Sequence, residues 1–349
     1  MRWIRDLSCG DPRVYLAVEI RRVFGQSCGK VKQEKLGWLA DNPLYTNRFA
    51  WYVGRRCRAA PIQAVARELR LDWHTVKEVE KQYRREQLRR AGMPGPRGIG
   101  SEESSIKKGH RYRLVVSDLE RRRVRWCGGK ERSEASMELF YQELGTKKSS
   151  KIRLAVMDLG KPFRTSTLKP QHAPHTAIRF DKFHGLRHLG EARDKVRQAE
   201  YRRLTGQDRQ FSKGQKYTLL SRREHVTLEG RQALKTLLAA NNRLQTADLL
   251  KESVGQLWSD QKEGWARRFF DNWRAALKWQ RLQPYEQFAE LLERHGEGIA
   301  AFCHPENKVA LGFVEGLNNK IRVIQRRAYG LRDEEYLRLK ILTCMLPEL

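Results

Sequence analysis

Lys and Arg outnumber Asp and Glu by 70 to 41 in this chain of 349 residues, giving a formal net charge of +29 and a pI near 10.2. Because so large a charge destabilises a compact chain by self-repulsion, it indicates a polyanionic partner, with nucleic acid first and an anionic membrane surface second. No run of residues approaches the roughly 18 apolar side chains of a membrane-spanning helix, so we expect no membrane partner.

The N-terminal sequence MRWIRDLSCGDPRVYL has no apolar stretch of the kind found in signal peptides. The six cysteines are scattered and never spaced as C-x-x-C, so we expect reduced thiols in a cytoplasmic protein and no zinc site. With 40% hydrophobic residues, the chain is long enough for two or three domains with apolar cores.

Two helices separated by a tight break are predicted within residues 45–92. The first covers residues 62–69, and the second begins near His74, with Asp72 as its natural N-cap. A short helix, a turn and a basic helix form the plan of a helix-turn-helix, whose second helix enters the major groove. An ordinary helical hairpin has the same pattern, but the basic residues favour DNA binding. The expected DNA contacts on this second helix are Thr75, Lys77, Arg84 and Arg85.

A Gly- and Pro-rich segment at residues 91–100 is the clearest domain boundary. After it, the pattern predicts a helix over residues 134–144 and strands over residues 111–117, 123–127, 152–158 and 177–181. This order predicts a mixed sheet flanked by helices.

From residue 185 to about residue 297 the sequence is almost wholly helical and basic. Four tryptophans recur there near heptad spacing, and we interpret them as core residues of a helical insertion, with DNA stacking as the minority alternative. They are Trp258, Trp265, Trp273 and Trp279.

Carboxylates follow two of the predicted strands, at Asp158 and Asp181, and a third acid, Glu315, lies on a late amphipathic helix. Carboxylate oxygens are the ligands that Mg²⁺ prefers, and paired divalent ions catalyse phosphoryl transfer. Each acid alone could be a turn former or part of a solvated basic helix. Together, and with Glu102 or Glu103 on the first strand, they favour a metal site. The cations expected to hold the DNA backbone beside Glu315 are Lys320, Arg322, Arg326 and Arg327.

The segment VEGLNNKIRVIQRRAYGLRDEEYLRLKIL resembles the C-terminal signature of the ISL-three family of bacterial insertion-sequence DDE transposases. The resemblance continues through KGHRYRLVVSDLERRRVRW, IRLAVMDLGKPFR and AIRFDKFHGLRHLGEARDKVR and into the helix-turn-helix region. It implies an α/β fold: a ribonuclease-H-like mixed-sheet catalytic core with a large helical insertion, preceded by a helix-turn-helix DNA-binding region. It also implies that Asp158 and Glu315 are the second and third catalytic acids, supported by Asp181 and His184.

On this resemblance we expect metal-dependent DNA cleavage and strand transfer with Mg²⁺ or Mn²⁺. The partners would be double-stranded DNA, as terminal inverted repeats and target, and further copies of the chain in a homo-oligomer on DNA. The protein would act in the bacterial cytoplasm, associated with the nucleoid. The expected segments are a remnant of a zinc-binding region (1–44), the helix-turn-helix (45–92), the first part of the core (98–184), the helical insertion (185–300) and the C-terminal helices of the core (301–349).

Two departures from the family pattern leave a second interpretation open. Glu102 stands where the first catalytic Asp is expected, and its extra methylene moves the carboxylate by roughly 1.5 Å. The second cysteine pair of the zinc region reads Gly25-Gln-Ser-Cys28, and one remaining thiol cannot hold zinc. The alternative is therefore a truncated, catalytically impaired or inactive remnant that only binds DNA. A membrane-surface or ribosome-associated basic protein is a third reading, and it leaves the strand-end acids unexplained.

Overall fold

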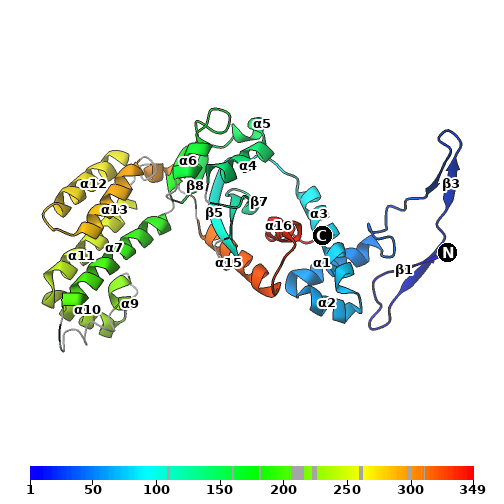
Figure 1. Ribbon diagram of the computed structural model, residues 1–349, viewed down its shortest axis with the longest axis horizontal. Coiled ribbons are helices and arrows are strands. Elements are labelled where there is room, and N and C mark those ends of the chain that lie inside the picture. Colours follow the sequence, from blue (N-terminus) through cyan, green and yellow to red (C-terminus); the bar gives the residue numbers. More distant parts are fainter. Residues whose placement is uncertain are drawn as a thin grey trace. The chain divides into compact units, whose positions relative to one another are not determined.

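The computed structural model describes residues 1–107, 111–131, 133–158, 161–180, 182–203, 205, 216–221, 226–258, 262–296, 301–307, 309 and 311–349 (Figure 1). The chain forms two compact units. The first contains Met1–Gly95, Glu103–Arg132 and Gly312–Leu349, and the second contains Pro96–Glu102 and Ser133–Leu311.

The first unit begins with two antiparallel hairpins. Strand β1 (Arg2–Arg5) pairs with β2 (Tyr15–Val18), and β3 (Arg22–Gly25) pairs with β4 (Lys30–Gln33). Cys28 lies in the turn of the second hairpin and is exposed.

Three helices follow the hairpins: α1 (Asn47–Ala59), α2 (Ile62–Leu69) and α3 (Trp73–Ala91). The turn between α2 and α3 contains Arg70 in the left-handed region, and the Asp72 side chain caps α3 by accepting from the backbone N–H groups of His74 and Thr75. A Cβ atom on Gly54 would lie 2.1 Å from Tyr83 Cγ, so only glycine allows α1 and α3 to approach this closely. The helix-turn-helix arrangement expected from the sequence is therefore present.

The last two helices belong to the same unit and cover a hairpin of the sheet. Helices α15 (Gly312–Arg327) and α16 (Glu334–Thr343) share an apolar cluster with strands β6 (Arg111–Asp118) and β7 (Arg123–Gly128). The cluster joins Leu317 and Ile321 of α15 to Ile341 of α16 and Val115 of β6. Burial of these side chains fixes the orientation of α15, with Glu315 on its exposed side.

A five-stranded mixed sheet has the strand order β7-β6-β5-β8-β9. Strand β5 (Gly98–Lys107) pairs in parallel with β8 (Leu154–Met157), which pairs in parallel with β9 (Ala177–Phe180), whereas β6 and β7 are antiparallel. Helices α4 (Glu134–Leu144), α5 (Thr146–Ser149) and α6 (Lys161–Thr167) lie in the connections. The α/β fold with a mixed sheet, expected from the sequence, is confirmed.

The second unit also contains a helical bundle, seen in Figure 1 from green (α7) to orange (α13). A single apolar cluster runs through it, and the buried ion pair Arg193–Asp248 joins α7 to α11. Its elements are α7 (Lys182–Arg203), α9 (Lys216–Leu220), α10 (Leu228–Ala240), α11 (Asn242–Val254), η2 (Gly255–Trp258), α12 (Glu263–Leu277), α13 (Gln283–Arg294), η3 (Ala301–Cys303) and η4 (Pro305–Asn307). None of the helices in the described ranges is both long and apolar enough to cross a bilayer.

The tryptophan stripe expected to form the bundle core is only partly internal. Trp273 is buried and its indole N–H donates to the Leu250 carbonyl at 3.1 Å, as expected for a core residue. Trp265 and Trp279 are 69% and 82% exposed, so the expectation was wrong for both. Trp265 lies in the first turn of α12 and Trp279 lies beyond its last residue, so neither faces the core with Trp273. The side chain of Trp258 lies outside the part that the structure describes.

Candidate functional site

Glu102 and Asp158 directly follow a pair of residues on two neighbouring strands. The parallel register of β5 and β8 pairs Ser101 with Met157; Glu102 is the next residue of β5, and Asp158 is the first residue after the end of β8. Paired positions in a parallel sheet point to the same face, and adjacent strands lie roughly 4.8 Å apart. The structure thus brings together two acids that are 56 positions apart in the sequence.

A histidine contacts the second of these acids. Nδ1 of His184, in the first turn of α7, lies 2.8 Å from Oδ1 of Asp158, and the two side chains are 19% and 14% exposed. This close contact limits the rotation of the carboxylate, as the partners around metal ligands do in metal sites. Asp181, the other expected supporting residue, lies outside the described residues.

Glu315 occupies the first turn of α15 and is exposed. It belongs to the first unit, whereas Glu102 and Asp158 belong to the second. Within the described residues, no three His, Cys, Asp or Glu side chains converge in a ready-made metal site. The two acids at the sheet are still of the right chemical type for a divalent ion, because Glu102 and Asp158 offer hard oxygen ligands.

The cations expected on the recognition helix are engaged within the first unit. Lys77 Nζ lies 2.6 Å from Asp333 Oδ2, and Arg85 donates to Glu335 Oε1 at 2.6 Å. Arg84 is 5% exposed and donates to Thr343 Oγ1 at 2.6 Å. The guanidinium of Arg84 is therefore part of the packing against α16 and is not positioned on a free DNA-facing surface.

Thr75 keeps the position expected of it in the first turn of α3. Its backbone N–H donates to Asp72 and its side chain is half-buried. The cations of α15 form a more open surface: Lys320, Arg322 and Arg326 are exposed and form no ion pair within the described ranges. Arg327 is also exposed, and it donates to the carbonyl oxygen of Arg58 at 3.3 Å.

A buried carboxylate organises the contact between α3 and α16. Glu80 is fully buried and accepts from Arg84, from Lys340 Nζ at 2.9 Å and from the Tyr336 hydroxyl. Burial alone would raise the pKa of Glu80, but the charges of Arg84 and Lys340 outweigh it and hold that pKa below its usual value. Burial also raises the pKa of Tyr336, which therefore stays a donor.

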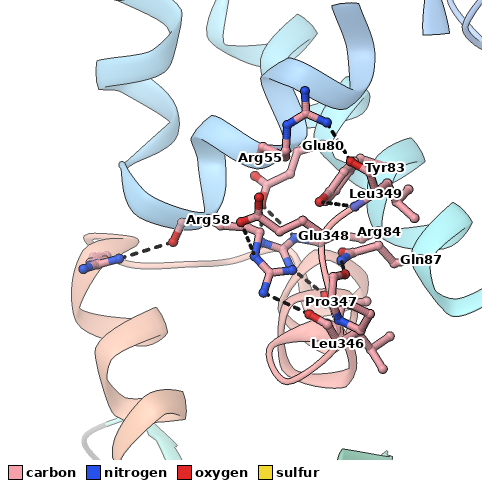
Figure 2. A network of polar contacts seen from close by, with 12 residues as sticks. Arg55, Arg58, Glu80, Tyr83, Arg84, Gln87, Leu346, Pro347, Glu348 and Leu349 are labelled. Atoms are coloured by element: carbon pink, nitrogen blue, oxygen red, sulfur yellow. Dashed lines mark hydrogen bonds and ion pairs between the residues drawn. The ribbon is translucent and has the colours of Figure 1, made fainter. Parts of the chain in front are cut away.

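The segment Leu346–Leu349 is bound to α1 and α3, as Figure 2 shows. Arg55 donates to the Leu349 carbonyl at 2.6 Å, Arg58 to the Leu346 carbonyl at 3.0 Å, and Gln87 to the Pro347 carbonyl at 2.6 Å. These bonds fix the helix-turn-helix to the C-terminal helices within one unit. No sequence pattern indicated this network, because its partners are more than 250 positions apart and have no recognisable spacing.

Comparisons with known proteins agree with this architecture. A family described as "Transposase" matches residues 99–341, and the family "Helix-turn-helix domain of transposase family ISL3" matches residues 34–84. The chain is 34% identical to the transposase for insertion sequence element IS1001 of Bordetella parapertussis, over 98% of this chain and 84% of that protein.

The transposase for insertion sequence element IS1557 is a more distant relative. It is recorded in two strains of Mycobacterium tuberculosis and is 25% identical over 97% of this chain and 80% of its own length. No solved structure gives a significant match. Two matching family domains, in the order helix-turn-helix then catalytic domain, together with the relative at 34% identity, show that this chain is an insertion-sequence transposase of the ISL3 family.

Proposed function

We propose that the protein cleaves and joins DNA strands at the terminal inverted repeats of its element, using Glu102, Asp158 and Glu315 to hold Mg²⁺ or Mn²⁺. The observation that supports this most is that Glu102 and Asp158 each follow directly on the residues Ser101 and Met157, which are paired between adjacent parallel strands. Bound divalent ions would supply an activated oxygen nucleophile and charge stabilisation at the scissile phosphate. Glu315, exposed on α15, is the proposed third ligand.

His184 acts in this proposal as a positioning residue. The close contact between its Nδ1 and Oδ1 of Asp158, at 2.8 Å, restricts the rotation of that carboxylate. A ligand held in one orientation binds a metal without first losing rotamer freedom. Asp181 is the second proposed supporting residue.

Glu102 stands where the family pattern has Asp, and its ability to bind metal separates the proposed active enzyme from an impaired one. Glu keeps the charge of the expected Asp. It occupies the β5 position that directly follows the pair Ser101–Met157. We propose that Glu102 binds metal in this chain with lower efficiency than Asp would. The alternative, a remnant that only binds DNA, predicts no cleavage under any metal condition.

DNA recognition is proposed to use two surfaces. The first turn of α3, with Thr75, would read the terminal repeat in the major groove. The exposed cations of α15 would hold the phosphate backbone near Glu315. Pairing two element ends implies a homo-oligomer on DNA, acting at the chromosome in the bacterial cytoplasm.

The test is a cleavage assay on a plasmid carrying the terminal repeats that flank the gene, with Mg²⁺ or Mn²⁺. Asp158→Asn and Glu315→Gln should each abolish nicking while gel-shift binding of the same DNA is kept. Glu290→Gln on the exposed face of α13 is the matched control and should cleave as the native protein does. Nicking that survives Asp158→Asn would overturn the assignment.

A further inference from the structure

A cavity of about 650 Å³ opens within the first unit, between the helix-turn-helix and the loop that joins α15 to α16. Its walls come from the end of α1, the start of α2, the inner face of α3, the last turns of α15 and the start of α16. None of the contacts proposed above for the reaction or for duplex recognition requires such a hollow.

The walls combine apolar and aromatic side chains. Pro61 and Ile62 line the cavity on one side and Leu331 on the other, with Trp73 and Tyr329 as aromatic members. Trp73 is 42% exposed and Tyr329 is 88% exposed, so both rings lie at the opening to solvent. Exposed aromatic rings beside apolar walls suit a flat ring that stacks.

Tyr329 is held outward by an unusual backbone. Its φ is 46°, and the next residue, Gly330, has φ 102°. A non-glycine residue in the left-handed region costs conformational energy and is enriched at functional sites. An aromatic side chain kept exposed at that cost is better explained by a ligand than by packing, since Tyr329 is 88% exposed.

The charge of the cavity selects an anion. Its lining contains seven cationic side chains and one carboxylate, Asp333. Lys77, Arg84 and Lys340 are matched by acids inside the unit. Lys320 and Arg332 form no ion pair within the described residues and are exposed, so they give the opening a net positive charge. A ligand with an aromatic ring and a phosphate matches both properties: the ring suits the aromatic walls, and the phosphate suits the positive charge at the opening.

We propose that this cavity receives one unstacked nucleotide of the bound DNA, with its base against Trp73 and Tyr329 and its phosphate beside Lys320 and Arg332. This inference rests on the proposed function, because it takes the DNA to be bound along α3 and α15. A volume of about 650 Å³ accommodates one nucleotide and excludes a duplex. Proteins that capture a base outside the stack do so by aromatic stacking in a pocket of this kind.

The probe is a 30-base-pair duplex of mixed sequence that carries one 2-aminopurine opposite an abasic site, compared with the fully paired duplex. The full chain should bind the unpaired probe about tenfold more tightly, because a base without a pairing partner is extruded from the stack at lower cost. Stacking on the protein rings should quench the 2-aminopurine fluorescence of that probe.

Two variants change the two properties of the cavity, its aromatic ring and its positive charge. Tyr329→Asn deletes the ring but keeps a residue that tolerates positive φ. Val323→Glu places an anion on the cavity wall, at a position that is already 43% exposed. Matched controls are Tyr217→Asn and Leu249→Glu, at exposed positions in the second unit. Both cavity variants should lose the quenching and the tenfold preference, and both controls should keep them.

The possible failures are distinguishable. Equal affinity for the two probes, or quenching that survives both cavity variants, overturns the inference and leaves the proposed function standing. A third outcome is that free 2-aminopurine deoxynucleotide, at micromolar concentration and without DNA, is quenched to the same extent. That result overturns the inference in favour of a site for a free mononucleotide. A native chain that binds neither duplex contradicts the proposed function, and the inference falls with it.

Discussion

Nδ1 of His184 lies 2.8 Å from Oδ1 of Asp158, and this contact joins the start of α7 to the residue that follows β8. Both side chains are partly shielded from solvent, so an interaction between them is only weakly screened. It ties the orientation of a proposed metal ligand to the first turn of the helix that enters the bundle. Several consequences of this geometry and of the α3–α16 contact are measurable.

Loss of the imidazole should weaken metal use without removing the metal ligands. His184→Ala is expected to lower Mg²⁺-dependent nicking by about 10- to 100-fold, with a shift of the Mg²⁺ midpoint to higher concentration. His184→Asn keeps a donor at the Nδ1 position and should restore much of the loss. A Mg²⁺ titration of nicking measures both. His175→Ala, at an exposed histidine, is the control, and an unchanged midpoint in His184→Ala would refute the positioning role.

Shortening the first acid should raise activity. Glu102→Asp withdraws the carboxylate by roughly 1.5 Å toward the strand, the position that the family pattern prefers. We expect faster nicking with Mg²⁺ or Mn²⁺ and unchanged duplex affinity in a gel shift. If the native protein nicks and Glu102→Asp changes nothing, the side-chain length at this position does not limit the reaction.

The buried network of Glu80 should dominate the stability of the first unit. Glu80→Gln leaves Arg84 and Lys340 buried without their counter-charge, which costs about 3–5 kcal/mol in comparable buried pairs. The measurement is the free energy of unfolding from urea titration. Glu78→Gln, on the exposed side of α3, should change it by no more than about 0.5 kcal/mol. Equal effects of the two substitutions would show that the network is not stabilising.

The same network should make the stability of the fold depend on pH. The pKa of Glu80 in the folded chain lies below its usual 4.5. Burial alone would raise the pKa of Asp333, but hydrogen bonds from Lys77 and the Tyr336 amide outweigh it and lower that pKa below 3.8. Each carboxylate therefore stabilises the fold fully above its unfolded pKa and loses that contribution as pH falls through the folded value. We expect thermal stability to fall below about pH 4.5, and Glu80→Gln to flatten that fall.

The acids at the start of α16 should compete with DNA for the cations of α3. Asp333→Asn keeps the helix cap, and combined with Glu335→Gln it frees Lys77 and Arg85 and leaves Lys81 with Glu78 as its ion-pair partner. If the freed cations reach phosphates, nonspecific binding tightens and its salt slope steepens by about 0.9 per new contact.

Gel shifts across a salt series measure this slope. Glu334→Gln is the control, since Glu334 pairs with Arg113 of β6 and not with α3. A slope unchanged in the double variant would show that these cations do not reach DNA even when they are free.

Local signals in the sequence predicted much of the fold. Asp72 marks the start of α3, the helix expected over residues 134–144 is α4, and the strand expected over residues 177–181 is β9 (Ala177–Phe180). These features depend on periodicity and capping, which act over a few residues.

Features that depend on distant contacts were not predictable in this way. A run of basic residues on α3 has the same pattern whether it meets phosphate or the acids of α16, and Arg84 proves to be buried against Thr343. Likewise the spacing of Trp265 and Trp273 does not show which one faces the bundle core. Tertiary packing decided both cases.

The central claim is that Glu102, Asp158 and Glu315 hold one divalent-metal site, and Fe²⁺-directed cleavage of the polypeptide tests it most directly. With Fe²⁺ in place of Mg²⁺, ascorbate and peroxide generate radicals that cut the chain beside the bound ion. The account predicts cuts near residues 102, 158 and 315 in the native protein bound to DNA, suppressed by excess Mg²⁺ and lost in Asp158→Asn. Cuts at other places, or the same cuts in Asp158→Asn, would contradict it.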